Sequence, residues 1–260
     1  MSARLLSACL LAVALSARAG PQLDHVIVVV KDLDTAAITY GALGFRMKPG
    51  TLHPNNLVNR HIKFRDGTEI ELMALGGPPG DAMARGYAAL LALRPGGAYA
   101  ALKAENLESV AEAARRVGLV VRRSSSGPWH FLGFEGNEAP SIFFIAGYES
   151  PRDPVSLFSH ENGADGLVEA WVEGGAKLEA LLRELGAAPG GRTCAADRRC
   201  GNRWRLGDRD LVIVPPASAE APARLLGVVL RKRDEAKARA FDLPAGFWVT
   251  FEPSPTTSIR

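Results

Sequence analysis

Two ionisable residues stand in segments that the sequence predicts to be buried strands. His25 directly precedes the β-branched run 26–30, and Glu71 lies between Ile70 and Leu72. A carboxylate in such surroundings costs folding free energy unless a metal, a cation or hydrogen bonds compensate its charge. A buried histidine taken alone is more often a hydrogen-bonded core residue than a ligand. Together the two residues indicate a candidate small-molecule site.

Further polar and aromatic side chains are candidates for contact with a substrate. The loop 51–60 carries His53 and Asn59 and is predicted to hydrogen-bond a polar substrate, although Asn-rich loops are more often solvated turns. Trp129 is predicted to line the same pocket, although aromatic residues in strands are more often core. Tyr99 completes this set of predicted substrate-binding residues.

The elements that must position these residues recur along the chain. The stretches 24–44, 98–118 and 166–186 share one order, which is a strand, an acidic or polar turn, an amphipathic helix and a closing glycine. The successive glycines stand 74 and 68 residues apart, which leaves room for two or three further strands in each unit. This spacing predicts βαβββ modules rather than solenoid repeats.

The first unit is predicted in most detail. Its expected elements are a strand at 26–30, a helix capped by Asp32 and Asp34 and ended by Gly44, and strands at 45–48, 59–65 and 68–75. Asp66-Gly67 between the last two strands is a strong hairpin signal. The unit is therefore β-α-β-β-β.

The later units repeat this order less completely. The second is predicted to have strands at 99–103, 120–123, 129–135 and 142–148 with a helix at 107–117, and a connector helix is predicted at 82–93. The third is predicted to have a helix at 178–185 and a strand at 210–214. The strands predicted at 225–230 and 247–251 are either a degraded fourth unit or a hairpin that completes a sheet.

Several short motifs occur in the order of a known superfamily. They are Leu23-Asp24-His25-Val26, Asp32-Leu33-Asp34, Leu43-Gly44-Phe45, His53-Pro54, Asn59-Arg60, Asp66-Gly67, Glu69-Ile70-Glu71-Leu72 and, further on, His160-Glu161-Asn162-Gly163-Ala164. In tandem βαβββ units this combination resembles the vicinal oxygen chelate superfamily, and the first unit is similar to glyoxalase-like domains. The resemblance implies an α+β fold in which tandem βαβββ modules pair into a cupped mixed sheet, with a third, degenerate module.

The resemblance also implies a metal site at the floor of the cup. His25 matches the first-strand ligand and Glu71 the fourth-strand ligand of a divalent Fe, Mn, Ni or Zn ion that acts as a Lewis acid. Counting from the closing glycines places Tyr99 and Leu167 where the first unit has His25. The same count places Ile145 and Ile213 where it has Glu71, so two ligands remain.

Other polar residues are candidates to complete the ligand set. They are His130, His61 and Glu169, and of these His130 is the best predicted metal ligand although none matches a ligand position in the glycine count. A site without any metal remains the alternative.

Two functions follow from this resemblance. The first is a metal-assisted lyase, isomerase or dioxygenase step on a small oxygenated molecule, with His25 and Glu71 on the metal and Glu71 as the catalytic residue. The second is a metal-free protein that binds and sequesters a small ligand without catalysis. Loss of ligands in the second and third units favours the latter, and survival of His25 and Glu71 favours the former.

The first nineteen residues differ from the rest of the chain. Arg4 precedes the apolar run 5–15, and Ala17-Arg18-Ala19 matches a cleavage site, which predicts a secretory signal at 1–19 and a periplasmic or secreted protein. The run is shorter than the roughly 20 residues of a membrane-spanning helix. The expected domains are then a glyoxalase-like pair of modules at 22–150 and a third module with C-terminal strands at 151–260.

Export changes the interpretation of the cysteines. Cys9 would leave with the signal, so the mature chain keeps Cys194 and Cys200, with five residues between them. In an oxidising compartment this pair predicts a disulfide that closes a surface loop. A zinc site is the weaker interpretation because no histidine or further cysteine lies nearby to complete it.

The charge pattern argues against nucleic acid as a partner. The formal net charge is +3, and it falls to about +1 if Arg4 and Arg18 are removed with the signal. No basic tract interleaved with aromatic residues is present in the sequence. The expected partner is a small-molecule ligand, with no nucleic acid, no membrane contact after signal removal, and a monomeric or homodimeric state.

Overall fold

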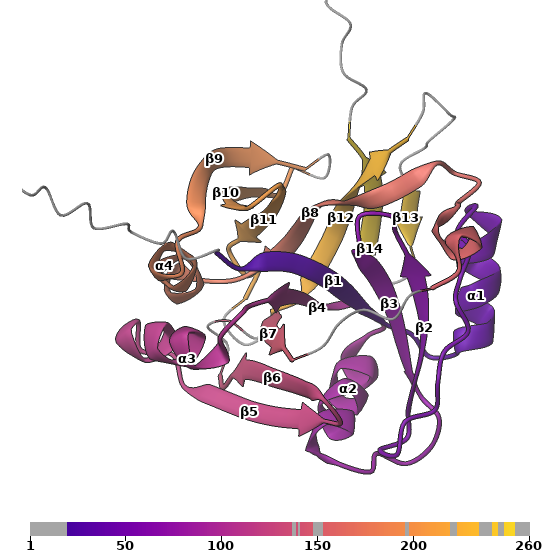
Figure 1. The fold of residues 1–260 in the computed structure, drawn as a ribbon, viewed down its shortest axis with the longest axis horizontal. Helices are drawn as coiled ribbons and strands as arrows, with labels where there is room; N and C mark the ends of the chain where they lie inside the picture. Colours follow the sequence, from indigo (N-terminus) through magenta and orange to yellow (C-terminus); the bar gives the residue numbers. More distant parts are fainter. Residues whose placement is uncertain are drawn as a thin grey trace, which may run out of the picture.

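The computed structural model describes residues 20–136, 139, 141–147, 153–195, 198–218, 223–233, 241–243 and 247–252. The predicted signal segment therefore lies outside the described residues. Among the described residues the strands form two seven-stranded mixed sheets, here called sheet A and sheet B (Figure 1). The α+β fold of paired modules that the sequence predicts is confirmed.

Sheet A joins the first two predicted units. Its strand order is β2 (Leu57–Lys63), β3 (Glu69–Leu75), β1 (Gln22–Val29), β4 (Gly96–Lys103), β7 (Ile142–Ala146), β6 (Trp129–Phe134) and β5 (Val121–Ser126). Strand β1 pairs in parallel with β3 of its own unit and antiparallel with β4 of the second unit. The two units therefore share one continuous sheet through their first strands.

Sheet B repeats this plan. Its strand order is β13 (Phe241–Leu243), β14 (Phe247–Phe251), β12 (Leu225–Lys232), β8 (Ala164–Glu173), β11 (Arg209–Val214), β10 (Cys200–Leu206) and β9 (Ala188–Cys194). Strand β8 pairs in parallel with β11 and antiparallel with β12, as β1 does with β3 and β4. Sheet B is thus a second copy of the architecture of sheet A.

The C-terminal strands form a fourth unit rather than a simple hairpin. Strand β12 pairs in parallel with β14, and β14 pairs antiparallel with β13. This is the arrangement of β4, β7 and β6 in the second unit. Of the two possibilities that the sequence left open, the degraded fourth unit is therefore correct.

The helices occupy the predicted positions within a few residues. They are α1 (Leu33–Ala42), α2 (Ala82–Leu93), α3 (Leu107–Arg116) and α4 (Ala176–Glu184). A short 3₁₀ helix, η1 (Val155–Phe158), was not predicted. Asp32 caps α1 by accepting a hydrogen bond from the Thr35 amide, and Gly44 ends it with a φ of +83°, which only glycine adopts at little cost. Within the described part of the chain, no helix has both the length and the hydrophobicity to cross a membrane.

One predicted strand of the first unit does not form. Residues 45–48 contribute only an isolated bridge between Lys48 and His61. The segment instead follows α1 closely, where the Phe45 amide still bonds to the carbonyl of Tyr40 and the Arg46 amide bonds to the ring of His160. These contacts satisfy the amides of Phe45, Arg46 and Lys48 in place of a strand ladder with β2.

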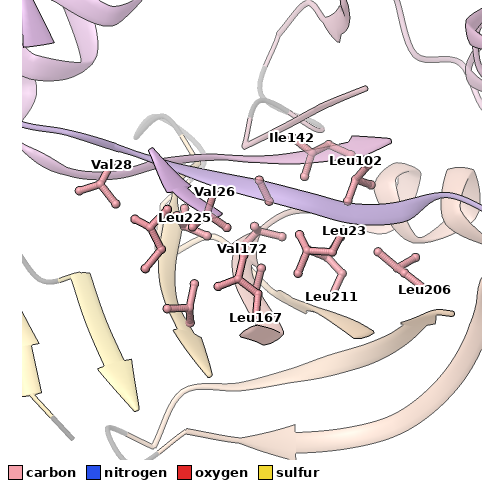
Figure 2. Packing of buried hydrophobic residues seen from close by; sticks show 14 of the residues in the cluster. Leu23, Val26, Val28, Leu102, Ile142, Leu167, Val172, Leu206, Leu211 and Leu225 are labelled. Atoms are coloured by element: carbon pink, nitrogen blue, oxygen red, sulfur yellow. The ribbon is translucent and has the colours of Figure 1, made fainter. Parts of the chain in front are cut away.

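The main hydrophobic core lies between the two sheets. Figure 2 shows Leu23, Val26 and Val28 of β1 directed toward sheet B. They meet side chains of β8, β11 and β12, among them Leu167, Val172, Leu211 and Leu225. The two sheets therefore pack through one face each, and each sheet has a second face that is directed away from this core.

The second face of sheet A, called the inner face here, carries the alternate residues of the strands. Its apolar part includes Ile27 and Val29, which pack against Ala84, Tyr87 and Leu90 of α2. Figure 1 shows α2 between the β5–β6 hairpin and the β2–β3 hairpin. The connector helix therefore packs against the face that the resemblance predicts as the floor of the cup.

Candidate functional site

His25 and Glu71 meet on the inner face of sheet A, as predicted. They lie on the adjacent parallel strands β1 and β3, and the Nε2 atom of His25 is 3.8 Å from an Oε atom of Glu71. The two residues are 7% and 9% exposed, so both polar groups are buried. The 3.8 Å separation is longer than a hydrogen bond. Each group is therefore left with capacity for another partner.

A β-bulge places Asp24 beside His25. The pairing of β1 with β4 shifts between Leu23 and His25, which lets two successive side chains lie close together. The Asp24 carboxylate is 2.7 Å from Nδ1 of His25. Burial lowers the pKa of His25, but this hydrogen bond and the negative charges of Asp24, Glu71 and Glu69 outweigh it and raise the pKa from 6.5 to about 9. The ring is therefore an imidazolium near neutral pH.

Glu71 is held by Asn59 on the neighbouring strand β2. The Asn59 side-chain amide donates a 2.7 Å hydrogen bond to one carboxylate oxygen of Glu71. The Asn59 carbonyl oxygen in turn accepts a hydrogen bond from the Thr51 amide, which fixes the orientation of the side chain. Asn59 was predicted to bind substrate; its contacts in the structure are those of a residue that orients Glu71.

An ion-pair chain continues from the site along the same face. Lys63 lies 2.6 Å from Glu69 and 3.5 Å from Asp153, and Asp153 lies 2.6 Å from Lys48. Burial raises the pKa of Glu69, but hydrogen bonding to His61 and the positive charges of His61, His25 and Lys63 lower it to about 2. The carboxylate of Glu69 is therefore ionised and already neutralised by its neighbours.

Aromatic rings form the other side of the site. The ring of Phe143 on β7 contacts the ring of His25 at 5.9 Å and that of Tyr99 at 6.0 Å between centroids. Tyr87 of α2 contacts Tyr99 at 5.6 Å. Burial raises the pKa of both tyrosines, so their hydroxyls stay protonated. Tyr99, a predicted substrate-binding residue, is therefore brought to the site.

Equivalent backbone hydrogen bonds between the strands give a more reliable alignment of the units than counting residues from their closing glycines. After the first strand of three units, an amide bonds to a carbonyl of the last strand: Val30 to Met73, Ala104 to Ile145, and Gly174 to Val214. Counting back five residues from each amide gives His25, Tyr99 and Glu169. Counting back two from each carbonyl residue gives Glu71, Phe143 and Val212.

This alignment corrects the glycine count for several positions. The counterparts of Glu71 are Phe143 and Val212 rather than Ile145 and Ile213. The counterpart of His25 in the third unit is Glu169 rather than Leu167. Glu169 therefore does lie in register with a ligand position, although on sheet B and not near His25.

The remaining predicted site residues are not brought to His25 and Glu71. His130 pairs with Ala146 on β7 and shares its face with the core residue Leu132, whereas the inner-face residue Phe131 points the other way. His53 closes the turn before β2 through backbone bonds to Leu57 and Asn56. Trp129 lies on β6, two strands beyond β4, and alternation places it on the inner face with Phe131.

The donor set does not fit a resident metal. Among the described residues, no three His, Cys, Asp or Glu side chains are grouped so as to hold an ion. His25 and Glu71 face each other, but their counterparts from the second unit are Tyr99 and Phe143. A phenyl ring offers no ligand atom, and burial keeps the tyrosine hydroxyl protonated. The predicted third ligand, His130, lies on the other face of the sheet.

Sequence reasoning missed several residues of the site. Glu69 has the same parity as Glu71 in its strand, so strand alternation alone was enough to place it on the same face. Asp24 is adjacent to His25, and only the β-bulge turns both side chains to one region. Tyr87 and Asp153 come from a connector and from the segment between the two sheets, and no local pattern links them to the site.

Comparison with known proteins supports the resemblance. A family model described as "Glyoxalase-like domain" matches residues 23–186, which is more than half of the chain. Comparison with curated proteins gave no match.

Solved structures show the same fold at low sequence identity. A hypothetical protein from Staphylococcus aureus has a TM-score of 0.63 and 13% identity, covering 90% of this chain and 99% of that one. A 2,2',3-trihydroxybiphenyl 1,2-dioxygenase from Sphingomonas wittichii has a TM-score of 0.56 and 16% identity, with coverages of 89% and 90%. A 4-hydroxymandelate synthase variant from Streptomyces coelicolor has a TM-score of 0.59 and 11% identity, covering 83% of this chain and 72% of that one. At these identities the likeness concerns the fold alone.

Proposed function

Because this chain belongs to the glyoxalase-like domain family, we propose that it binds a small oxygenated molecule on the inner face of sheet A without a resident metal. The His25–Glu71 pair carries this proposal. The pair presents a buried imidazolium and a buried carboxylate 3.8 Å apart. One ligand hydroxyl can accept a hydrogen bond from Nε2 of His25 and donate one to Glu71, which satisfies both groups.

The surroundings of the pair support a preformed binding site. Asp24 hydrogen-bonds to His25 and Asn59 hydrogen-bonds to Glu71, each at 2.7 Å. Such second contacts fix functional side chains in the geometry that a ligand needs. Phe143 and Tyr99 supply an apolar wall against which the carbon skeleton of the ligand can pack.

Metal-assisted lyase, isomerase or dioxygenase chemistry is the less favoured alternative. It needs more than two protein ligands, and the register places Tyr99 and Phe143 where the further ligands would stand. A protonated His25 also competes with metal binding, since a ligating imidazole must be neutral. The proposed function is therefore binding through hydrogen bonds and charge.

A ligand screen tests this proposal. Vicinal diols, α-hydroxy acids and hydroxyketones are added to the purified protein, and the thermal midpoint is measured for the unmodified chain and for Glu71→Gln and His25→Gln. We expect at least one compound to raise the midpoint of the unmodified chain and of neither variant. Lys103→Gln, on an exposed residue at the end of β4, is the control that should bind normally. A compound that stabilises all four proteins equally would contradict the proposed site.

We also propose that the protein is exported. The disulfide between Cys194 and Cys200 supports this, because such bonds persist mainly in oxidising compartments. It joins the facing ends of β9 and β10, so the predicted pairing of the two cysteines is confirmed. N-terminal sequencing of the protein recovered from the periplasmic fraction checks the proposal. A chain that begins at Gly20 is expected, and one that keeps Met1 would contradict it.

A further inference from the structure

The helix α2 is a connector that contributes to the site without belonging to a βαβββ module. Its residues Ala84, Tyr87 and Leu90 are buried against Ile27 and Val29 on the inner face of sheet A. Through Tyr87 it contacts the ring of Tyr99, and the charge of Glu71 helps to raise the pKa of the Tyr87 hydroxyl. A ligand bound at Glu71 therefore lies next to α2.

The N-terminal end of α2 is tied to the turn before β2. Asp81 caps the helix by accepting a hydrogen bond from the Ala84 amide, and it also accepts one from the Asn55 side chain. The Gly80 amide bonds to the Asn55 carbonyl, and the Asn56 side chain bonds to the Pro78 carbonyl. This end is thus fixed by Asn55 and Asn56 of the first unit.

The C-terminal end of α2 is held from the other sheet. The last turn of the helix contains no basic residue of its own. Instead, Nη2 of Arg224 donates hydrogen bonds to the carbonyls of Leu90, at 3.2 Å, and Arg94, at 2.6 Å. A cation here complements the negative end of the helix. It gives the Arg94 carbonyl a donor and adds a second donor to the Leu90 carbonyl, which also accepts the Arg94 amide.

The position of Arg224 is itself fixed by sheet B. Its backbone amide donates to the carboxylate of Glu173 at the end of β8, and the next residue begins β12. Leu225 is so close to β4 that a Cβ on Gly97 would lie 2.1 Å from the Leu225 carbonyl oxygen. Arg224 is only 5% exposed. A long cationic side chain is therefore buried where the start of β12 lies next to the C-terminal end of α2.

We infer that Arg224 is a positioning residue that latches α2, and with it Tyr87, onto the inner face of sheet A beside the His25–Glu71 site, so that the second half of the chain shapes the site of the first. The inference rests on the proposed function only in treating the covered face as a binding face. The helix then serves as a cover whose C-terminal end opens when the latch is released.

Hydrogen exchange measured by mass spectrometry tests the latch without a ligand, so its failure is distinguishable from failure of the proposed function. Arg224→Met removes both hydrogen bonds but keeps most of the side chain. Exchange in residues 82–93 should become at least tenfold faster, with β1 and β3 changed less than twofold. Arg224→Lys keeps the charge and should give a smaller effect in the same segment, because one ammonium replaces the guanidinium fork.

Arg209→Met is the matched control. Arg209 also reaches from sheet B into the first half, where Nη2 donates to the Asp66 carbonyl at 3.1 Å, but it does not contact α2. This variant should leave exchange in 82–93 unchanged relative to β1 and β3. Nitration of Tyr87, mapped by mass spectrometry, should increase only in the Arg224 variants because an opened α2 exposes the phenol.

Two outcomes would overturn the inference. One is unchanged exchange in 82–93 in Arg224→Met. The other is acceleration of that segment by the same factor as β1 and β3, which would show a loss of global stability rather than the opening of a cover. If the methionine variant does not fold, the lysine variant decides by the same two criteria.

Discussion

The inner face of sheet A and the corresponding face of sheet B differ most at positions that the strand register makes equivalent. His25 on β1 corresponds to Glu169 on β8, and Glu71 on β3 corresponds to Val212 on β11. The first face thus has a histidine opposite a carboxylate. The second has a carboxylate opposite an apolar residue.

The second face satisfies its own charges. Arg203 on β10 lies 2.6 Å from Glu169 and 3.3 Å from Asp210, and the indole of Trp171 donates a 2.9 Å hydrogen bond to Glu169. On the inner face of sheet A, by contrast, His25 and Glu71 are 3.8 Å apart and do not hydrogen-bond to each other. Buried charge alone therefore does not identify a binding site, because charges that are already paired within the protein need no ligand to neutralise them.

The covering of the two faces also differs. On sheet A, α2 lies over the apolar end of the face and Tyr87 borders the site. On sheet B, Trp171 and Trp248 pack on one another at 5.5 Å over Val212 and Val214. A face closed by its own strands is suited to stability, whereas a face closed by a separate helix can be opened.

The strongest test of this comparison restores the missing ligands on sheet A. Tyr99→His with Phe143→Glu places an imidazole and a carboxylate at the counterparts of His25 and Glu71. We expect the dissociation constant for Zn²⁺ to fall by about a thousandfold, equivalent to roughly 4 kcal/mol. Isothermal titration of the double variant and of the unmodified chain measures it.

The control for this gain is Tyr99→His with Phe143→Gln, which adds one ligand and no second carboxylate. It should bind Zn²⁺ much less tightly than the glutamate version. Equal affinity of the double variant and the unmodified chain would show that the four positions do not converge, and the register alignment would then be wrong.

The pH dependence of stability tests the charge state of His25. The pKa of His25 rises from 6.5 to about 9 on folding, so its contribution to stability is fully present below pH 6.5 and is lost as the pH rises through 9. The size of this contribution is on the order of 3 kcal/mol at most. Urea unfolding at pH 6 to 10 should show a decline in the unmodified chain that is absent in His25→Gln. Parallel curves for the two proteins would contradict a protonated His25.

The ion pairs of Arg203 with Glu169 and Asp210 on sheet B are expected to contribute less to the free energy of unfolding than His25 does. Arg203→Met leaves Glu169 and Asp210 without their shared cation, and burial already raises the pKa of both carboxyls. Because the Arg203 side chain is partly exposed, we expect a loss of about 2 kcal/mol rather than the larger cost of a fully buried pair. Denaturant unfolding at pH 7 measures it.

Replacing all three charged residues by apolar ones is the control for Arg203→Met. In Arg203→Met with Glu169→Met and Asp210→Leu, this network no longer contains a charge, so most of the lost stability should return. If the triple variant is no more stable than Arg203→Met, the loss arises from packing and not from unpaired carboxylates.

Removing the support of Glu71 should have the smallest effect. Asn59→Ala deletes the 2.7 Å hydrogen bond to the Glu71 carboxylate and should cost about 1.5 kcal/mol. A double-mutant cycle with Glu71→Gln isolates the coupling of the pair, measured by urea unfolding. A coupling energy near zero would mean that Asn59 acts through its bond to the Thr51 amide instead.

The sequence was sufficient for the modules and for the central pair. The β-branched run after His25, the Asp66-Gly67 hairpin and the closing glycines predict the elements that place His25 and Glu71 on neighbouring strands. These features are local, and local patterns are what periodicity and turn chemistry report.

The rest depended on contacts that are distant in the chain. The third unit is two residues shorter between the end of its first strand and Gly186, so counting from the glycine misplaced Glu169. Arg224 meets Leu90 across 134 residues, and no pattern near either residue indicates that contact. The faces of β6 likewise became clear only when Phe131 was seen against Phe143, which places His130 on the opposite side.

The metal content of the purified protein decides whether His25 and Glu71 bind a ligand without a resident metal. The purified protein is analysed for Mn, Fe, Ni and Zn as isolated, and each metal is then titrated into the unmodified chain and into Glu71→Gln. We expect substoichiometric metal in the protein as isolated and equally weak binding by the unmodified chain and Glu71→Gln. One equivalent of metal in the unmodified chain, lost in Glu71→Gln, would contradict it and show that His25 and Glu71 are metal ligands.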